Sequence, residues 1–192
     1  MKILKVAFLA FVLGTRLASA QGTFVYDQQS TGSVDASANL NQTPIGQSFT
    51  PMLDSIGFIE IQLFDGLSAS TVAINIRSGS IAGSVLGTSL PTTVPGSSSG
   101  IYDFFFSNPI MLTPGTKYYF EPVVVSGGFA GSDFTFIQYL GGDAIIGGTT
   151  DTDRDFWFRE GVINAVPEPA SAALFAVAGG ALCWYRRKRR AT

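Results

Sequence analysis

Polar and apolar residues alternate in several short stretches of this chain, with the period of two that is typical of β-strands. Residues 71–77, for example, place Val72, Ile74 and Ile76 on one face of a strand. The same spacing recurs in Tyr118, Phe120 and Val124, in Phe134 and Phe136, and in Phe156 and Phe158. Further strands are expected at residues 23–27, 45–50, 55–64, 84–90, 101–106 and 109–112.

Glycine, serine and proline are concentrated between these stretches, where they favour turns. The turn-rich segments are residues 91–100, 113–116, 126–132 and 141–153. No window of useful length has the period of an amphipathic helix. The pattern therefore predicts an all-β fold of about nine to ten strands, an antiparallel β-sandwich with a jelly-roll-like arrangement.

The first 20 residues have the features of a secretory signal peptide. Two lysines precede an apolar run over residues 6–14, and small residues follow at positions 18–20. The apolar run is too short to span ~30 Å of hydrocarbon. We therefore expect export through the Sec machinery, with cleavage between Ala20 and Gln21.

A second apolar stretch lies near the C-terminus, where residues 170–185 form 16 positions without a charge. As a helix it would reach about 24 Å, slightly less than the ~30 Å core of a bilayer. Basic residues follow it directly: Arg186, Arg187, Lys188, Arg189 and Arg190. Because basic clusters stay in the cytoplasm, we predict a single transmembrane helix that is stopped by this cluster.

Charge is divided unevenly between the parts of the chain. Residues 21–165 contain 13 acidic and 4 basic residues, a net charge of −9, whereas the whole chain has −2. Because residues 21–165 are strongly acidic, nucleic acid is not favoured as a partner. The sequence thus predicts a signal peptide (1–20), an extracytoplasmic β-sandwich domain (21–165) and a C-terminal tail (166–192).

The tail combines three features in a fixed order. It begins with Val166, Pro167, Glu168 and Pro169, continues with an apolar run, and ends in the basic cluster. This order resembles the PEP-CTERM sorting tail of Gram-negative bacteria, although the apolar run here has more alanine and less leucine than is usual. The two prolines deny the motif regular hydrogen bonding and keep it extended, where a protease can reach it.

The resemblance implies a route as well as a motif. A protein of this kind is held briefly in the cytoplasmic membrane and is then processed near the Pro-Glu-Pro motif by exosortase, a membrane cysteine protease. Its expected final location is the cell surface or the extracellular matrix of a Gram-negative bacterium. Exopolysaccharide is the partner that such a location implies.

Several segments of the middle domain carry a second resemblance. They are residues 46–51, 56–63, 72–89, 104–120, 139–143 and 155–159. In this order they are similar to bacterial extracellular β-sandwich modules that occur beside varied anchors, some of them related to carbohydrate-binding jelly rolls. Each segment is also ordinary turn and strand chemistry, so the similarity bears on fold more than on function.

The chain contains few of the residue types that commonly act in catalysis. There is no histidine, and the single cysteine, Cys183, lies in the apolar tail. These facts exclude Ser-His-Asp and Cys-His catalysis and an internal disulfide. Glu60, Glu121 and Glu160 are candidates for a carboxylate pair in glycoside hydrolysis, but each alternates with apolar neighbours, which indicates outward-facing strand positions. We therefore predict that the protein is not an enzyme.

Acidic residues at alternate positions form the sharpest local motif. Asp151, Asp153 and Asp155 have a spacing that suits the hard oxygen ligands of Ca²⁺, but the glycine and glutamate of an EF-hand loop are missing. Two interpretations stay open: a calcium site outside the EF-hand class, and a solvated acidic turn capped by Arg154. No other cofactor is predicted.

Aromatic side chains are the usual means of binding sugars, because ring faces stack on pyranose rings. Four residues lie opposite apolar sets or near loops and are candidate glycan contacts: Tyr102, Tyr119, Tyr139 and Trp157. Packing in the core is the alternative use of each ring. Two roles for the middle domain therefore stay open, a non-enzymatic surface or matrix protein and, alternatively, a carbohydrate-binding module that recognises a specific glycan.

Overall fold

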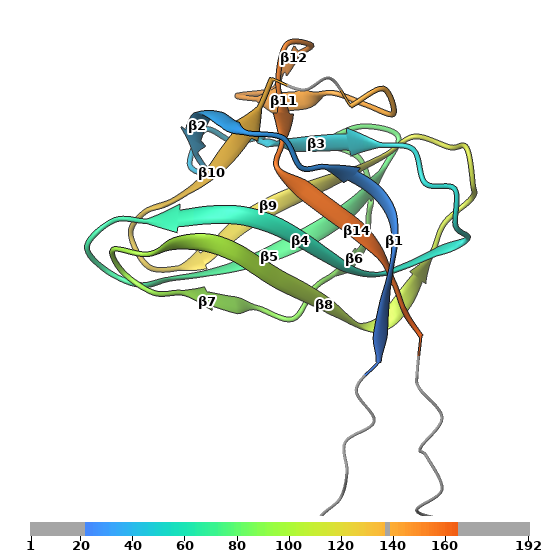
Figure 1. Ribbon diagram of the computed structural model, residues 1–192, viewed down its shortest axis with the longest axis horizontal. Helices are drawn as coiled ribbons and strands as arrows, with labels where there is room; N and C mark the ends of the chain where they lie inside the picture. Colours follow the sequence, from blue (N-terminus) through green and yellow to red (C-terminus); the bar gives the residue numbers. More distant parts are fainter. Residues whose placement is uncertain (1–21, 137–138, 165–192) are drawn as a thin grey trace, which may run out of the picture. The chain divides into compact units, whose positions relative to one another are not determined.

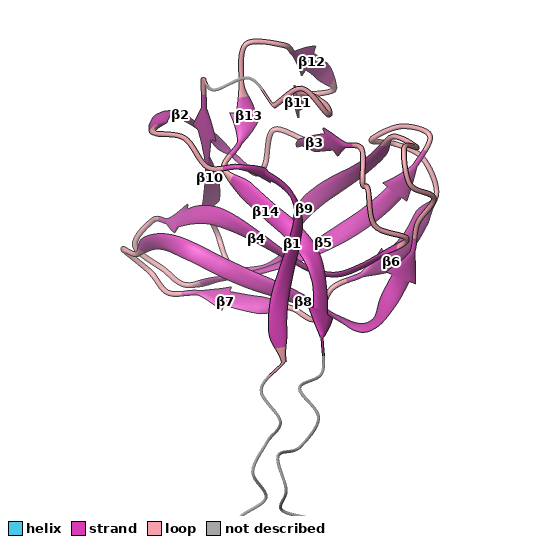
Figure 2. Ribbon diagram, turned by 45° about the vertical axis from the view of Figure 1, so that its right-hand side comes forward, coloured by secondary structure: helices cyan, strands magenta, loops and turns pink. Residues whose placement is uncertain are grey.

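The computed structural model describes residues 22–136 and 139–164. This part of the chain consists of strands and loops, and no helix occurs in it (Figure 2). Residues Phe24–Ile163 form one compact unit. The fourteen strands form two antiparallel sheets, so the predicted all-β fold is confirmed (Figure 1). The jelly-roll-like connectivity stays a prediction.

Each sheet has seven strands. The first sheet has the order β1-β14-β4-β10-β13, with β2 paired to β10 and β8 paired to β4. Its strands are β1 (Thr23–Ser30), β2 (Val34–Asn39), β4 (Ser55–Asp65), β8 (Ser99–Met111), β10 (Ala130–Thr135), β13 (Asp155–Phe156) and β14 (Phe158–Asn164).

The second sheet has the order β12-β11-β3-β9-β5-β6, and β7 also pairs with β5. Its strands are β3 (Gly46–Phe49), β5 (Ser70–Ser78), β6 (Val85–Thr88), β7 (Thr92–Val94), β9 (Tyr118–Ser126), β11 (Ala144–Ile146) and β12 (Thr149–Asp151).

The hydrophobic core lies between the two sheets, as in a sandwich. Ile59 and Ile61 of β4 belong to the same buried cluster as Ile74 of β5. Aromatic rings complete the contact, since Phe120 of β9 meets Phe158 of β14 with 5.3 Å between ring centroids. Inward-facing residues of both sheets therefore exclude water from a single core.

The period of two places most of the predicted apolar sets correctly. Val72, Ile74 and Ile76 are fully buried, which confirms the inner face of β5. Phe120 is fully buried as well, and its neighbour Tyr118 contributes to the core from the same face of β9. In these central strands the alternation alone fixes which side chains point inward.

Two predicted orientations are wrong. Phe134 is fully buried, but Phe136, predicted on the same face, is half exposed because β10 ends at Thr135 and the alternation ends with it. Glu160 was expected to face outward, yet it is fully buried opposite Ile59, one of the core residues. It therefore points between the sheets.

The chain changes partner at Trp157. Phe156 ends β13, which pairs with β10, and Phe158 begins β14, which pairs with β4. The break at Trp157 allows Phe156 and Phe158 both to be buried, as their spacing predicts, although they belong to different strands. Four short strands, β2, β7, β11 and β12, were not predicted because they are polar or lie in turn-rich segments.

The predicted signal peptide, its cleavage site at Ala20 and Gln21, and the C-terminal transmembrane helix lie outside the described residues. Between residues 22 and 164, as far as the structure describes them, no helix is long and apolar enough to cross a membrane. The N-terminal end of β1 and the C-terminal end of β14 lie side by side at one end of the domain (Figures 1 and 2).

Gly161 marks a close approach of β14 to β1. A Cβ atom at this position would lie 2.0 Å from the carbonyl oxygen of Val25, which is backbone and cannot rotate away. Gly100 in β8 is a matched control, because a Cβ atom there meets nothing within 4 Å.

We expect Gly161→Ala to lower the free energy of unfolding by about 2–3 kcal/mol, because the added methyl group forces β1 and β14 apart. Urea unfolding followed by tryptophan fluorescence measures the change. Gly100→Ala should leave stability within about 0.5 kcal/mol of the wild type. Equal stability of the two variants would contradict the close contact.

Candidate functional site

A row of charged side chains crosses the outer face of the first sheet. The register pairs Arg159 of β14 with Glu60 of β4, and Glu60 in turn with Asp103 of β8. Arg159 Nε lies 2.5 Å from Glu60 Oε2, so these two groups form an ion pair. Asp103 is exposed, whereas Glu60 is only 5% exposed.

Two aromatic rings flank the guanidinium group of this row. Arg159 Cζ lies 4.8 Å from the ring centroid of Tyr26 and 5.2 Å from that of Trp157. Such contacts let the ring electrons stabilise the cation. Tyr26 is 42% exposed, and Trp157 is largely covered at 8%. We call Tyr26, Glu60, Asp103, Trp157 and Arg159 the outer-face cluster.

The electrostatics of the cluster are not balanced. Burial raises the pKa of the Glu60 carboxyl, Arg159 lowers it, and the negative charge of Asp103 raises it again. The cluster thus has one arginine, paired with Glu60, and two carboxylates that lie directly opposite each other on neighbouring strands. Like charges in that position destabilise a sheet.

Strand phase explains why these residues meet. On β4, Ile59 and Ile61 take the inner positions, so Glu60 between them must face outward. On β14, Phe158 and Glu160 face inward, and Arg159 between them therefore faces outward beside Glu60. Register across three strands then aligns the charges, although they are far apart in the sequence.

The second sheet carries a smaller and balanced cluster on its outer face. Arg77 Nε donates to Glu121 Oε2 at 2.8 Å, and Arg77 Nη1 donates to the Gly83 carbonyl at 2.8 Å. Asn75 also donates to Glu121 at 3.2 Å. One cation and one anion satisfy each other here, so the arrangement serves the sheet itself.

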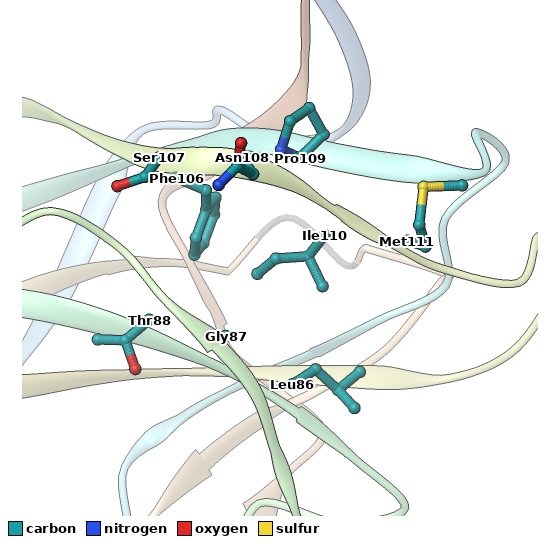
Figure 3. Close-up of a pocket in the computed structure, with 9 residues that line it drawn as sticks. All are labelled: Leu86, Gly87, Thr88, Phe106, Ser107, Asn108, Pro109, Ile110 and Met111. Atoms are coloured by element: carbon teal, nitrogen blue, oxygen red, sulfur yellow. The ribbon is translucent and has the colours of Figure 1, made fainter.

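A pocket of about 480 Å³ opens between β6 and the end of β8. Phe106 and Ile110 point from β8 toward Gly87 of β6, with Leu86 and Met111 beside them (Figure 3). None of its nine lining residues is charged. It supplies neither an acid nor a base for chemistry.

The three aspartates of the predicted calcium site do not converge. Asp151 Oδ2 lies 3.4 Å from Arg154 Nε, and Asp151 Oδ1 accepts a hydrogen bond from the Asp153 backbone N–H at 3.1 Å. Asp155 is buried and points away into the protein. In the part of the chain that the structure describes, no three acidic groups come together in a way that could hold a metal ion. The geometry fits the acidic turn capped by Arg154.

Asp155 instead holds a loop in place together with Tyr139. Its carboxylate accepts hydrogen bonds from Gln47 Nε2 at 2.7 Å and from the Tyr139 backbone N–H at 2.8 Å. The Tyr139 hydroxyl donates to Gln28 Oε1 at 2.9 Å. Burial raises the pKa of both Asp155 and Tyr139. Tyr139 is half-buried and packs against the core, and its role as a glycan contact stays a prediction.

The remaining predicted glycan contacts differ in position. Tyr102 packs against the core and shares a hydrogen bond with Ser98 Oγ at 2.8 Å. Tyr119 is half-buried on β9, in register with Arg77 of the balanced cluster. Trp157 contacts Arg159 in the outer-face cluster and is the predicted ring that lies at the candidate site.

Sequence reasoning missed Tyr26, Asp103 and Arg159 as members of this site. It considered Glu60 only as half of a hydrolase pair with other glutamates. Alternation along single strands predicts that Tyr26 and Arg159 point away from the core. It gives no register between strands, and register is what brings the charges together.

The C-terminal residues have a match among known families. Residues 165–190 match the family described as the PEP-CTERM protein-sorting motif. The chain carries a PEP-CTERM sorting motif. No curated protein matches the chain. The PEP-CTERM resemblance predicted from the sequence is thereby confirmed, whereas the resemblance of the middle domain to anchored β-sandwich modules stays a prediction.

The PEP-CTERM motif indicates the route of the protein. It implies export, sorting at the membrane to the cell surface, and exosortase as the processing partner. The match spans the Pro-Glu-Pro residues Val166–Pro169 and the basic cluster that ends at Arg190. The motif therefore implies that the β-sandwich domain, which precedes it in the chain, is exported.

Proposed function

We propose that this PEP-CTERM protein is a non-enzymatic component of the cell surface or extracellular matrix, associated with exopolysaccharide in a Gram-negative bacterium. The sorting motif at residues 165–190 carries the proposal, because exosortase processing delivers the domain outside the membrane. The absence of histidine from the chain supports a role without catalysis. The acidic balance of residues 21–165 argues against nucleic acid as a partner.

The tail works as an address that anchors for a limited time. Its uncharged run of 16 residues is slightly short for a permanent span, and the arginines hold its end in the cytoplasm. Pro167 and Pro169 are expected to keep the segment before the predicted helix free of regular hydrogen bonds. Exosortase then meets an extended substrate segment at the non-cytoplasmic surface of the cytoplasmic membrane.

Deletion of residues 166–192 should change where the protein accumulates and abolish processing by exosortase. Without the apolar run and its basic stop, the exported domain is no longer retained in the cytoplasmic membrane. Cell fractionation and mass spectrometry of both mature termini measure the result.

The control for this deletion is the full-length protein in cells that lack exosortase, where unprocessed protein should collect in the membrane. The proposal is contradicted if location and mass are the same with and without exosortase. It is also contradicted if the deletion leaves both unchanged.

A second candidate function is that of a carbohydrate-binding module that recognises a specific glycan. The outer-face cluster favours it, because an exposed tyrosine ring, an exposed carboxylate and an arginine lie on one sheet face. The two functions are compatible, since a matrix protein can bind the polysaccharide around it.

A further inference from the structure

We propose that the outer-face cluster binds an uncharged, hydroxyl-rich glycan, with Tyr26, Asp103 and Arg159 as its contacts. This inference rests on the proposed association with polysaccharide, and it names the site and the ligand class.

Asp103 supplies an exposed acceptor. Its carboxylate lies opposite Glu60, whose Oε2 forms an ion pair with Arg159 and whose Oε1 accepts a 3.5 Å hydrogen bond from the Tyr26 hydroxyl. Within residues 22–136 and 139–164, no basic side chain forms an ion pair with Asp103. A carboxylate that faces a second carboxylate is stabilised by hydrogen-bond donors. The hydroxyl groups of a sugar are such donors.

Arg159 supplies donors that are held in place. Its Nε forms an ion pair with Glu60, and its Cζ lies 4.8 Å from the ring centroid of Tyr26 and 5.2 Å from that of Trp157. The side chain as a whole is 28% exposed. A fixed arginine loses little conformational entropy when it donates to a ligand.

Tyr26 and its neighbourhood supply an apolar surface at the same place. The Tyr26 ring is 42% exposed, and Ile101, two residues before Asp103 on β8, is 47% exposed. A pyranose has both C–H surfaces and hydroxyl groups, so it can use an apolar ring and paired polar groups together. A ligand with only one of these features would leave part of the cluster unused.

The negative charge of the domain and of the cluster favours an uncharged ligand. Residues 21–165 have a net charge of −9, and the cluster itself has two carboxylates for one arginine. An anionic polysaccharide would be repelled both by the net charge of the domain and by the carboxylates of the cluster. A cation at the acid pair is disfavoured because Arg159 already contacts Glu60.

The balanced cluster on the second sheet shows what a purely structural arrangement looks like in this protein. There, Arg77 is saturated by Glu121 and by the Gly83 carbonyl, and the two charges cancel. The outer-face cluster has an additional carboxylate, Asp103, for which the described residues provide no ion pair. The structure therefore offers its own internal control.

The test is a glycan array of neutral and anionic oligosaccharides, probed with the purified full-length protein, followed by calorimetric titration of the neutral glycans that bind. We expect binding to neutral glycans and weaker or no binding to anionic ones. Asp103→Ala and Tyr26→Ala should each weaken the affinity by about tenfold, since each removes a direct contact. Asp103 is exposed, so Asp103→Ala should not affect folding.

Two matched variants control for loss of charge and loss of a ring elsewhere. Asp35→Ala removes an exposed carboxylate on β2, and Tyr119→Ala removes a half-buried ring on the second sheet. Neither should change the affinity. The inference is overturned by a blank array, by a preference for anionic glycans, or by Asp103→Ala binding like the wild type. Export and exosortase processing are measured separately, so any of these results leaves the proposed sorting and surface location standing.

Discussion

The domain is expected to lose stability as the pH rises from about 5 to about 9, and the buried carboxyl group of Glu160 is a main reason. Glu160 is fully buried on the inner face of β14, opposite Ile59. Burial, reinforced by the nearby negative charge of Asp27, raises the pKa of Glu160 from 4.5 to about 9. The Gln28 backbone N–H offsets this only in part.

The surroundings of Glu160 explain why it stays neutral. Its two carboxyl oxygens have no well-formed hydrogen bond from a donor. The Asp27 carboxylate is already engaged, because it accepts hydrogen bonds from the backbone N–H groups of Met52 and Leu53 at 2.7 and 2.9 Å. A proton on Glu160 allows it to donate to Asp27, whereas a second negative charge there would be buried beside the first.

The sign of the effect follows from proton binding. Between pH 4.5 and about 9 the folded protein holds a proton on Glu160 that the unfolded chain has released. Stability therefore falls as the pH rises through this window, by up to about 1.4 kcal/mol per pH unit, and becomes level above it. Below pH 4.5 both states are protonated, and this group has no further effect.

Glu160→Gln should flatten the pH dependence, because an amide keeps the shape and a donor but does not ionise. At pH 8.5 we expect the variant to be more stable than the wild type by about 3–4 kcal/mol, and at pH 5 to be of similar stability. Urea unfolding at a series of pH values measures this. Asp35→Asn, which removes a charge from an exposed position, should leave the slope unchanged. Parallel curves for Glu160→Gln and the wild type would show that Glu160 is ionised in the folded state.

Glu160 also shows where reasoning from sequence alone ends. The alternation that correctly buries Val72, Ile74 and Ile76 describes a strand with one apolar and one polar face. In β14 the inner face contains Phe158 and then an acid, so the pattern assigned Glu160 to the solvent side. A neutral carboxylic acid behaves as a polar but uncharged group. The pattern of polar and apolar residues in a sequence does not show whether a carboxyl group is protonated.

Strand ends and partner changes form a second limit. The predicted face containing Phe134 and Phe136 fails because β10 stops at Thr135, and the local sequence gives no turn signal there. The short strands β7 and β12 lie in segments rich in proline, glycine or threonine, which were read as turns. These strands form because a neighbouring strand offers unpaired backbone groups, and that is a tertiary effect.

The candidate site illustrates the same limit for function. Trp157 was predicted as a glycan contact, and it does lie in the outer-face cluster, but beneath Arg159 rather than as an exposed ring. The PEP-CTERM motif, in contrast, is a local and ordered pattern, so the sequence alone was enough to find it. The sorting motif can be found from local sequence alone, whereas the outer-face cluster depends on strand register.

Arg159→Met should destabilise the domain by about 3 kcal/mol, the cost typical of leaving a buried charge without its partner. Glu60 is 5% exposed and its ion pair with Arg159 is the contact that favours its charged form. Without the guanidinium group, the pKa of Glu60 must rise further, because burial and Asp103 both continue to raise it. The loss should therefore be larger at pH 8 than at pH 5, where a neutral Glu60 is easily accommodated.

The double variant Arg159→Met/Glu60→Leu separates the lost ion pair from lost packing. If the cost of Arg159→Met arises from the orphaned carboxylate, removing Glu60 as well should recover most of the stability, since apolar pairs often replace buried ion pairs without loss. Arg77→Met provides the comparison on the second sheet, where Glu121 is 9% exposed and retains a hydrogen bond from Asn75. It should cost less than Arg159→Met. If the double variant is as unstable as Arg159→Met alone, the arginine stabilises the sheet through its contacts with Tyr26 and Trp157, and the ion pair contributes little.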